Sequence, residues 1–136
     1  MIFGRFTERA QVVLVEAQQE SQNFKHGYIG TEHVLLGILK ENGYAGQLLA
    51  GKGITIDKVR KMTEDYLGFG DDDVSNGEML LTPRAKRLFD DSLDIARKYA
   101  ITTVPTMMIF KDGEVVDKMI GFLPKEHIKA KIEAQL

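Results

Sequence analysis

Apolar residues in the N-terminal part of the chain recur at the spacing of an α-helix. Between residues 7 and 24 they fall on one helical face: Ala10, Val13, Leu14, Ala17 and Phe24. Thr7 precedes this face, and its hydroxyl can accept from a backbone N–H of the first turn, so it is predicted to be the N-cap. The same spacing predicts helices from Thr31 to the Asn42-Gly43 stop, over 44–50 and over 55–67.

The helix over 55–67 and the one that follows it each have an apolar face. In the helix over 55–67 the residues expected to point inward are Ile56, Val59, Met62 and Tyr66. The next helix opens at Thr82-Pro83, because threonine caps a helix and proline suits its first turn. Its apolar face comprises Ala85, Leu88, Phe89, Ile95, Ala96 and Tyr99. Up to this point the pattern predicts helices alone.

The pattern changes near Ala100. Residues 107–110 form a short apolar run, Asp112-Gly113 is a typical hairpin turn, and a second strand is expected over 115–120. A final amphipathic helix starts at Pro124. The predicted fold class is therefore α+β, with an N-terminal bundle of about five helices followed by a ββα unit.

Residues 68–80 are rich in glycine and aspartate and lack any period, which predicts a solvated linker. Calcium binding by Asp71, Asp72 and Asp73 is an alternative, but no spaced oxygen ligands or closing glutamate follow. The expected organisation is a first helical repeat over 1–67, a linker over 68–80, the first helix of a truncated second repeat over 81–98 and a ββα tail over 99–136.

An internal repeat supports that organisation. TERAQ at 7–11 recurs as TPRAK at 82–86, which indicates a duplicated helical unit. If the repeat continued, the IGTEH motif at 29–33 should recur at 104–108, where VPTMM stands instead. The second copy loses its second helix and gains a strand. Such an abrupt break indicates recombination more than gradual divergence.

Three ordered motifs resemble a known family. FGRFTERA at 3–10, YIGTEHVLLGIL at 28–39 and LTPRAKR at 81–87 resemble the N-terminal domain of ClpC-type AAA+ unfoldases. That resemblance covers residues 1–98. YAITTVPT at 99–106 and MMIFKDGEVVDKMIGF at 107–122 resemble the C-terminal part of thioredoxin. The thioredoxin resemblance implies a cis peptide bond before Pro105, with a structural role for that proline.

Composition narrows the function. The chain has no cysteine, so it cannot perform the dithiol chemistry of thioredoxin, and no phosphate-binding loop is present. A formal net charge of −2 gives no basic field for nucleic acid or anionic membranes. His26 and His33 lack a third ligand at metal-site spacing. We therefore expect a cytoplasmic, non-enzymatic protein without cofactor, metal, nucleic-acid partner or membrane partner.

The Clp resemblance implies a docking site for adaptor proteins and phosphoarginine-bearing proteins in each repeat. Its residues correspond here to Arg5, Thr7, Glu8, Thr31 and Glu32. The second repeat keeps Thr82 and Arg84, but Met107 occupies the position of its glutamate. The residue types alone leave a structural alternative open. Both threonines are explained as N-caps, and Glu32 is favoured in a first turn by the helix dipole.

Two functions are therefore expected. The first is a recombinant or artificial chimera of a Clp N-terminal domain and a thioredoxin fragment, without a catalytic site. The alternative is a docking module that retains one phosphoarginine site on the first repeat. The tail adds an expectation about assembly, because a lone two-stranded hairpin is marginal in water. The hairpin should pack on helices of its own chain or form a homodimer through its edge.

Overall fold

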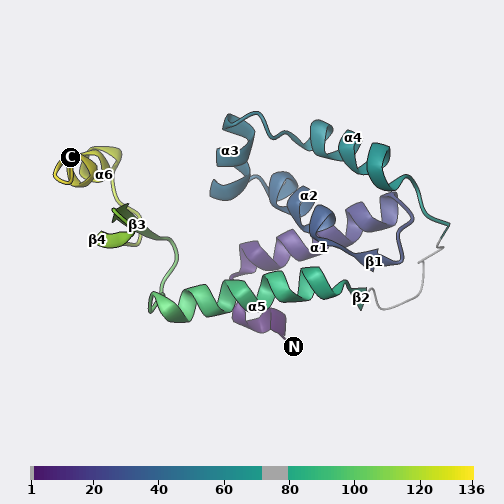
Figure 1. The fold of residues 1–136 in the computed structure, drawn as a ribbon, viewed down its shortest axis with the longest axis horizontal. Helices are drawn as coiled ribbons and strands as arrows, with labels where there is room; N and C mark the ends of the chain where they lie inside the picture. The colour runs from purple at the N-terminus through teal and green to yellow at the C-terminus, as the bar shows by residue number, and fades with distance from the viewer. Residues whose placement is uncertain (1, 72–79) are drawn as a thin grey trace. The chain divides into compact units, whose positions relative to one another are not determined.

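The computed structural model describes residues 2–71 and 80–136 (Figure 1). The chain divides into two compact units, Met1–Asp90 and Asp91–Leu136, each of which is described by itself. The first is helical and the second is built around a β-hairpin, so the predicted α+β class is confirmed. The domain boundaries expected from the sequence remain a prediction.

The elements follow the predicted order, with short additions. A 3-10 turn, η1 (Ile2–Arg5), precedes the first helix. The helices are α1 (Glu8–Asn23), α2 (Thr31–Glu41), α3 (Tyr44–Gly51), α4 (Ile56–Leu67), α5 (Pro83–Lys98) and α6 (Lys125–Glu133). The strands are β1 (Tyr28–Ile29), β2 (Leu80–Leu81), β3 (Thr106–Lys111) and β4 (Glu114–Ile120).

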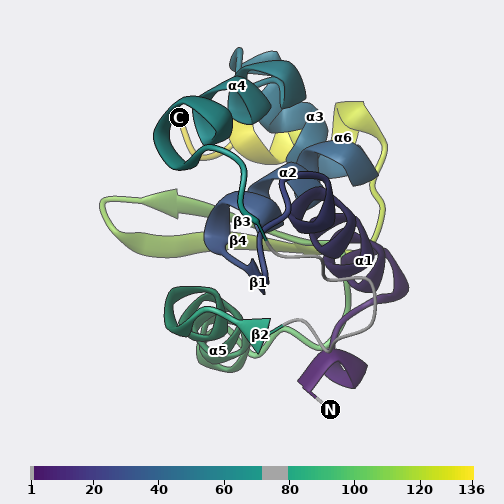
Figure 2. The same cartoon turned by 90° about the vertical axis from the view of Figure 1, so that its right-hand side faces the viewer.

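Helices α1 and α2 pack antiparallel and form the centre of the first unit (Figure 2). Arg9 near the start of α1 reaches Glu41 at the end of α2, with 2.6 Å between Nε and Oε1. At the other end, the Ser21 hydroxyl donates to the carbonyl of Tyr28. Between them, a side chain at Gly37 would collide with the Val13 carbonyl of α1. Glycine therefore permits the close approach of the two helices.

Two groups of apolar side chains fill the first unit. One centres on Ala17, Ile29, Val34 and Phe89, and includes the edge-to-face contact between Phe6 and Phe89 at 5.8 Å. The other centres on Phe24, Leu36, Leu39 and Val59. The apolar spacing along residues 7–24 therefore predicted the buried face of α1 correctly.

The expectation that helices alone precede Ala100 was wrong. Strands β1 and β2 pair in parallel, with Tyr28 opposite Leu80 and Ile29 opposite Leu81. Each strand is only two residues long and its partner lies far along the chain, so neither produces the alternating pattern by which strands are recognised. This pairing brings the start of α5 beside the start of α2.

Some residues expected to point inward are exposed. Met62 and Tyr66 on α4 are 57% and 81% exposed, and Ile95 on α5 is 56% exposed. Helix α4 buries only Val59 and Thr63. Helical spacing identifies a face, but how much of that face is covered depends on the neighbouring elements.

The second unit is a hairpin flanked by helical residues. Strands β3 and β4 pair antiparallel, with an irregularity between Ile109 and Phe110. The Val104–Pro105 peptide bond is cis. Lys131 of α6 forms an ion pair with Asp117 of β4 at 3.2 Å. The hairpin thus packs against helical residues of its own unit, which is one of the two arrangements expected for it.

Both ends of the linker predicted over 68–80 can be compared with the structure, and its last residue, Leu80, belongs to β2 and pairs with Tyr28. The backbone N–H of Gly70 donates to the carbonyl of Phe24 at 2.9 Å, so the chain just after α4 is held against the first unit. A side chain at Gly70 would collide with the Lys25 carbonyl. Residues 72–79, including Asp72 and Asp73, lie outside the described residues.

The packing predicts a large difference between two leucines. Leu36 is fully buried in α2, whereas Leu48 in α3 is 66% exposed. We expect Leu36→Ala to lower the free energy of unfolding by about 2–5 kcal/mol, because it leaves a cavity. The matched Leu48→Ala should change it by less than about 0.5 kcal/mol. Urea unfolding monitored by circular dichroism measures both, and similar losses would contradict the described core.

Candidate functional site

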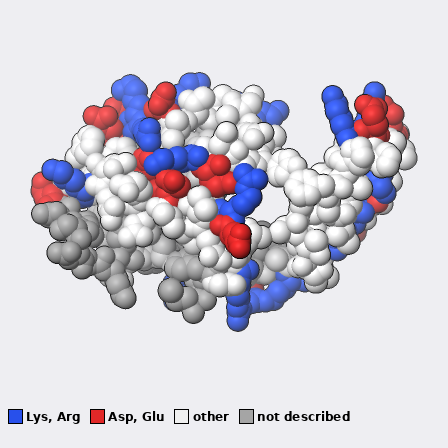
Figure 3. Space-filling view, turned by 180° about the vertical axis from the view of Figure 1, so that it is seen from behind, with Lys and Arg blue, Asp and Glu red and all other residues white. Residues whose placement is uncertain are grey.

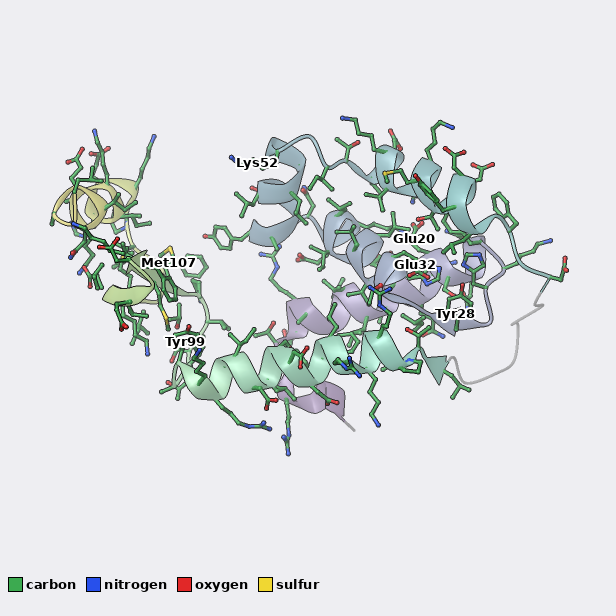
Figure 4. The ribbon with its side chains drawn as sticks, in the orientation of Figure 1. Glu20, Tyr28, Glu32, Lys52, Tyr99 and Met107 are labelled. Carbon is green, nitrogen blue, oxygen red and sulfur yellow. The ribbon has the colours of Figure 1, made fainter. Side chains whose placement is uncertain are left out.

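The first turn of α2 holds two of the candidate residues. Gly30 is the N-cap, and Thr31 and Glu32 follow it as half-buried residues. The Glu32 carboxylate folds back over Gly30, in the space that a side chain at position 30 would need. A carboxylate at this place is stabilised by the positive end of the α2 dipole. The carboxylate is partly accessible, and its Oε1 lies 3.5 Å from Nδ1 of His33 (Glu32 is labelled in Figure 4).

Tyr28 lies beside this carboxylate. Burial raises the pKa of the Tyr28 hydroxyl, and the negative charge of Glu32 raises that pKa further. The phenol therefore stays protonated and can donate a hydrogen bond at neutral pH. Tyr28 comes from β1 and Glu32 from α2, so the turn between these elements positions both groups.

A buried pair of histidines, His26 and His33, stabilises the turn between β1 and α2. The backbone N–H of Gly30 donates to Nδ1 of His33 at 2.9 Å, so the neutral His33 ring carries its proton on Nε2. That N–H donates to Nδ1 of His26 at 2.9 Å. Nε2 of His26 then donates to the carbonyl of Gly68, also at 2.9 Å. In this chain of bonds each ring nitrogen of both histidines has one partner.

The remaining candidate residues lie at the other end of the helix pair. Arg5 ends η1, Thr7 caps α1 through a 3.2 Å bond from the Ala10 N–H, and Glu8 is the first residue of α1. All three are exposed. Because α1 and α2 run antiparallel, the start of α1 lies near Glu41 rather than near Glu32. The structure thus does not bring Arg5, Thr7 and Glu8 together with Thr31 and Glu32.

The start of α5 lies closer to Glu32. The backbone N–H of Thr82 donates to the carbonyl of Ile29 at 3.0 Å, three residues before Glu32. The Thr82 hydroxyl caps α5 by accepting from the Ala85 N–H at 3.1 Å. Arg84, in the first turn of α5, is exposed. The first turns of α2 and α5 therefore flank the β1–β2 pair, with a carboxylate on one and a guanidinium on the other.

Sequence reasoning missed a buried charged cluster on α1. Glu20 is 1% exposed, and its carboxylate accepts from Nε and Nη2 of Arg60 at 3.0 and 2.5 Å. The hydrogen bonds from Arg60 lower the pKa of Glu20, and the charge of Lys40 adds to this effect. Glu20 and Ser21 continue the helical spacing of the apolar face of α1. Polar residues on a buried face need partners, so their positions in the sequence could have indicated a buried polar cluster.

A shallow pocket of about 240 Å³ adjoins this cluster, lined by Glu20, Asn23, Phe24, Arg60, Glu64 and Phe69. The oxygens of Glu20 are already bound by Arg60 and approached by Lys40 at 3.7 Å. The cluster is thus explained as a structural tie between α1, α2 and α4. No function needs to be assigned to the pocket.

Charged side chains of both signs are distributed over the surface of the described residues. Figure 3 shows basic and acidic side chains mixed on the face it presents, without a continuous area of one sign. Among the described residues, no group of three histidine or acidic side chains could hold a metal ion. None of the described helices is long and apolar enough to cross a membrane.

Fold and site together define a helical module with an internal repeat. Each copy of the repeat begins with a helix capped by a threonine, Thr7 for α1 and Thr82 for α5. The family model of the Clp repeat (R) N-terminal domain matches residues 5–109, and the chain belongs to this family. The resemblance seen in the three sequence motifs is thereby confirmed.

The ATP-dependent Clp protease ATP-binding subunit ClpC of Staphylococcus aureus (strain USA300) is 50% identical over 99 residues. ClpC of Staphylococcus epidermidis (strain ATCC 12228 / FDA PCI 1200) is 48% identical over the same length. Each alignment covers 72% of this chain but only 12% of the relative. The N-terminal domain of the chaperone ClpD from Arabidopsis thaliana matches in structure with a TM-score of 0.59 and 30% identity, over 74% of this chain and 69% of that one.

A second family model, thioredoxin, matches residues 85–134. The match confirms the resemblance of the tail and begins within α5 rather than at residue 99. Residues 85–109 are therefore shared by the two family matches. Most of α5 and the first part of β3 fit either family.

The histidine pair predicts that acid destabilises the fold. Burial lowers the pKa of His33, as does the neighbouring His26, although the charges of Glu32 and Glu20 oppose this. Below about pH 6.5 the unfolded chain takes up a proton that the folded chain resists. The free energy of unfolding should therefore fall between pH 7.5 and 5.5.

Urea unfolding at several pH values measures this dependence. His33→Gln should reduce the loss of stability across the range, whereas His127→Gln, at an exposed position, should leave it unchanged. An unaltered pH dependence in His33→Gln would contradict the role assigned to the buried pair.

Proposed function

We propose that the chain is a protein-docking module that recognises phosphoarginine on a partner protein or an adaptor. The site is assembled from Glu32 on α2 and from Thr82 and Arg84 at the start of α5. The observation that supports it is the hydrogen bond from the Thr82 N–H to the Ile29 carbonyl, which holds the first turns of α2 and α5 together.

The two sides of this site have opposite chemistry. The Glu32 carboxylate suits the guanidinium end of the ligand, because two parallel hydrogen bonds can form between these planar groups. The N-terminus of a 16-residue helix and the guanidinium of Arg84 suit the phosphate. Phosphoarginine carries both groups on one side chain, so it can engage both helix starts at once.

The other helix start should not form an equivalent site. Arg5, Thr7 and Glu8 offer an arginine and a capped helix, as Arg84 and Thr82 do. The glutamate that the repeat would bring to them is replaced by Met107 in β3. A phosphate alone could be attracted there, but the guanidinium would have no carboxylate partner.

The proposal is tested by titrating phosphoarginine into isotopically labelled protein and following two-dimensional NMR spectra. Glu32→Ala and Arg84→Ala should each weaken binding by about tenfold or more, since a hydrogen bond to a charged group contributes about 1.5–3 kcal/mol.

Arg5→Ala is the matched control for Arg84→Ala, because it removes an arginine beside the other helix start. It should leave the affinity unchanged. Free arginine and inorganic phosphate, tested separately, should each bind more weakly than phosphoarginine. If no resonance near Glu32 or Thr82 responds to phosphoarginine, the docking proposal is wrong.

A second proposal concerns the origin of the chain. We infer that it is a recombinant or artificial chimera in which a Clp N-terminal domain continues into a thioredoxin fragment. The overlap of the two family matches at 85–109 favours this origin, because an amphipathic helix and a strand acceptable to both families permit a junction without strain. The fragment carries no thioredoxin activity, since the chain has no cysteine.

The absence of redox chemistry can be measured directly. In an insulin-reduction assay with dithiothreitol as reductant, the protein should give the same rate as dithiothreitol alone, because disulfide exchange requires a thiolate. Thioredoxin provides the positive control. A rate above the background would show that some other group in the chain reduces disulfides.

A further inference from the structure

Residues outside the hairpin of the second unit contact it on both faces, while several hairpin side chains stay exposed, among them Phe110 at 52% and Ile120 at 58%. On one face, Asp117 of β4 forms an ion pair with Lys131 of α6, and Met119 is only 4% exposed. On the other, the ring of Tyr99, which is labelled in Figure 4, meets the ring of Phe110 edge to face at 5.7 Å between centroids. Lys118 also donates to the Tyr99 carbonyl at 3.1 Å. The backbone groups along the two edges of the hairpin are a separate part of its surface.

Strand β3 has no second neighbour among the described residues, where it pairs with β4 alone. The Gly121 N–H donates to the Pro105 carbonyl at 2.8 Å, which makes these residues a hydrogen-bonded pair next to Thr106 and Ile120. Hydrogen-bonded and non-bonded pairs alternate along an antiparallel ladder. The backbone groups of Thr106, Met108 and Phe110 therefore face away from β4.

The outer edge of β4 is protected. Lys118 lies opposite Met108, and its backbone N–H donates to the Asp117 carboxylate at 2.8 Å. This bond lowers the pKa of Asp117, as does Lys131, so the carboxylate stays charged. Charged side chains and a self-satisfied backbone group are devices that discourage edge pairing.

The edge of β3 has no such protection. From Thr106 to Phe110 the strand carries no charged side chain, and Lys111 stands only at its end. This is the composition of a strand that lies inside a sheet rather than at its edge. The unprotected backbone groups and the apolar composition both favour pairing with another strand.

We propose that β3 pairs with β3 of a second copy of this chain, in antiparallel orientation about a two-fold axis perpendicular to the sheet. With Met108 on the axis opposite itself, Thr106 faces Phe110 of the second copy and Met107 faces Ile109. Lys111 then faces Pro105, so no like charges meet across the new ladder. The result is a four-stranded antiparallel sheet with the protected β4 strands outermost.

The occupant is a second copy because the edge is complementary to itself. The two-fold axis places the backbone N–H and C=O of Met108 opposite the C=O and N–H of Met108 in the second copy. The two residues can therefore exchange two hydrogen bonds. Every apolar residue of the strand meets an uncharged one. A strand from another protein is an alternative occupant, and the following experiment distinguishes it.

Single cysteines provide the sharpest test, because the chain has none of its own. In a hydrogen-bonded antiparallel pair, opposite Cα atoms lie about 5.5 Å apart, within the range that a disulfide spans. Met108→Cys should therefore form a disulfide-linked dimer under mild oxidation. Val116→Cys on β4, which is also partly exposed, is the matched control.

The expected difference is a rate for Met108→Cys at least about tenfold above that for Val116→Cys, because pairing raises the local thiol concentration to the millimolar range. Light scattering behind a sizing column should give a mass that rises with concentration from the monomer value of 15.3 kDa toward twice that value. Met108→Pro should shift this equilibrium toward monomer, since proline removes the edge-facing N–H.

Three outcomes would overturn the proposal. The first is a mass that stays at the monomer value up to about millimolar concentration, because even a weak dimer would be populated there. Equal disulfide rates at positions 108 and 116 indicate random collision. A dimer that Met108→Pro leaves intact, with circular dichroism unchanged, uses some other surface. If Met108→Pro fails to fold, the cysteine rates decide.

Discussion

The first unit depends on a chain of hydrogen bonds that begins at the Gly30 N–H and passes through His33 and His26 to the Gly68 carbonyl. It joins the start of α2, the segment after α1 and the end of α4. Burying two imidazoles is costly unless every ring nitrogen has a partner. Here each nitrogen has one. The position of Glu32 depends on this arrangement, because the Gly30 amide that its carboxylate covers is held by His33.

A second polar cluster, formed by Glu20, Arg60 and Lys40, joins α1, α2 and α4. Glu20 is almost completely buried in α1, and Arg60 of α4 binds it through two hydrogen bonds. A buried carboxylate with a paired guanidinium specifies one arrangement of helices, since any shift would leave a charge unpaired. This cluster ties α1, α2 and α4 together, and the pairing of β1 with β2 holds the first turn of α5 beside that of α2. In the hairpin unit, by contrast, β3 pairs with β4 alone among the residues that the structure describes.

Sequence patterns predicted the helices well because each is stabilised by local features. Thr7 and Thr82 cap α1 and α5 through bonds to a residue three positions on, and the Asp112-Gly113 turn joins adjacent strands. The exposure of Met62 and Tyr66 could not be predicted in this way. Helical spacing shows which residues share a face, whereas burial depends on which neighbours cover that face.

The sequence by itself determined the family, the order of the helices and the hairpin, the break in the internal repeat and the absence of cysteine chemistry, because motifs and composition are local properties. Only the tertiary structure decided which helix starts meet. The Clp resemblance implied a site that groups Glu32 with Arg5, Thr7 and Glu8, but antiparallel packing of α1 and α2 separates them. The two-residue strands β1 and β2 bring Thr82 toward Glu32 instead. Contacts between segments so distant in the chain leave no periodic pattern from which they could be read.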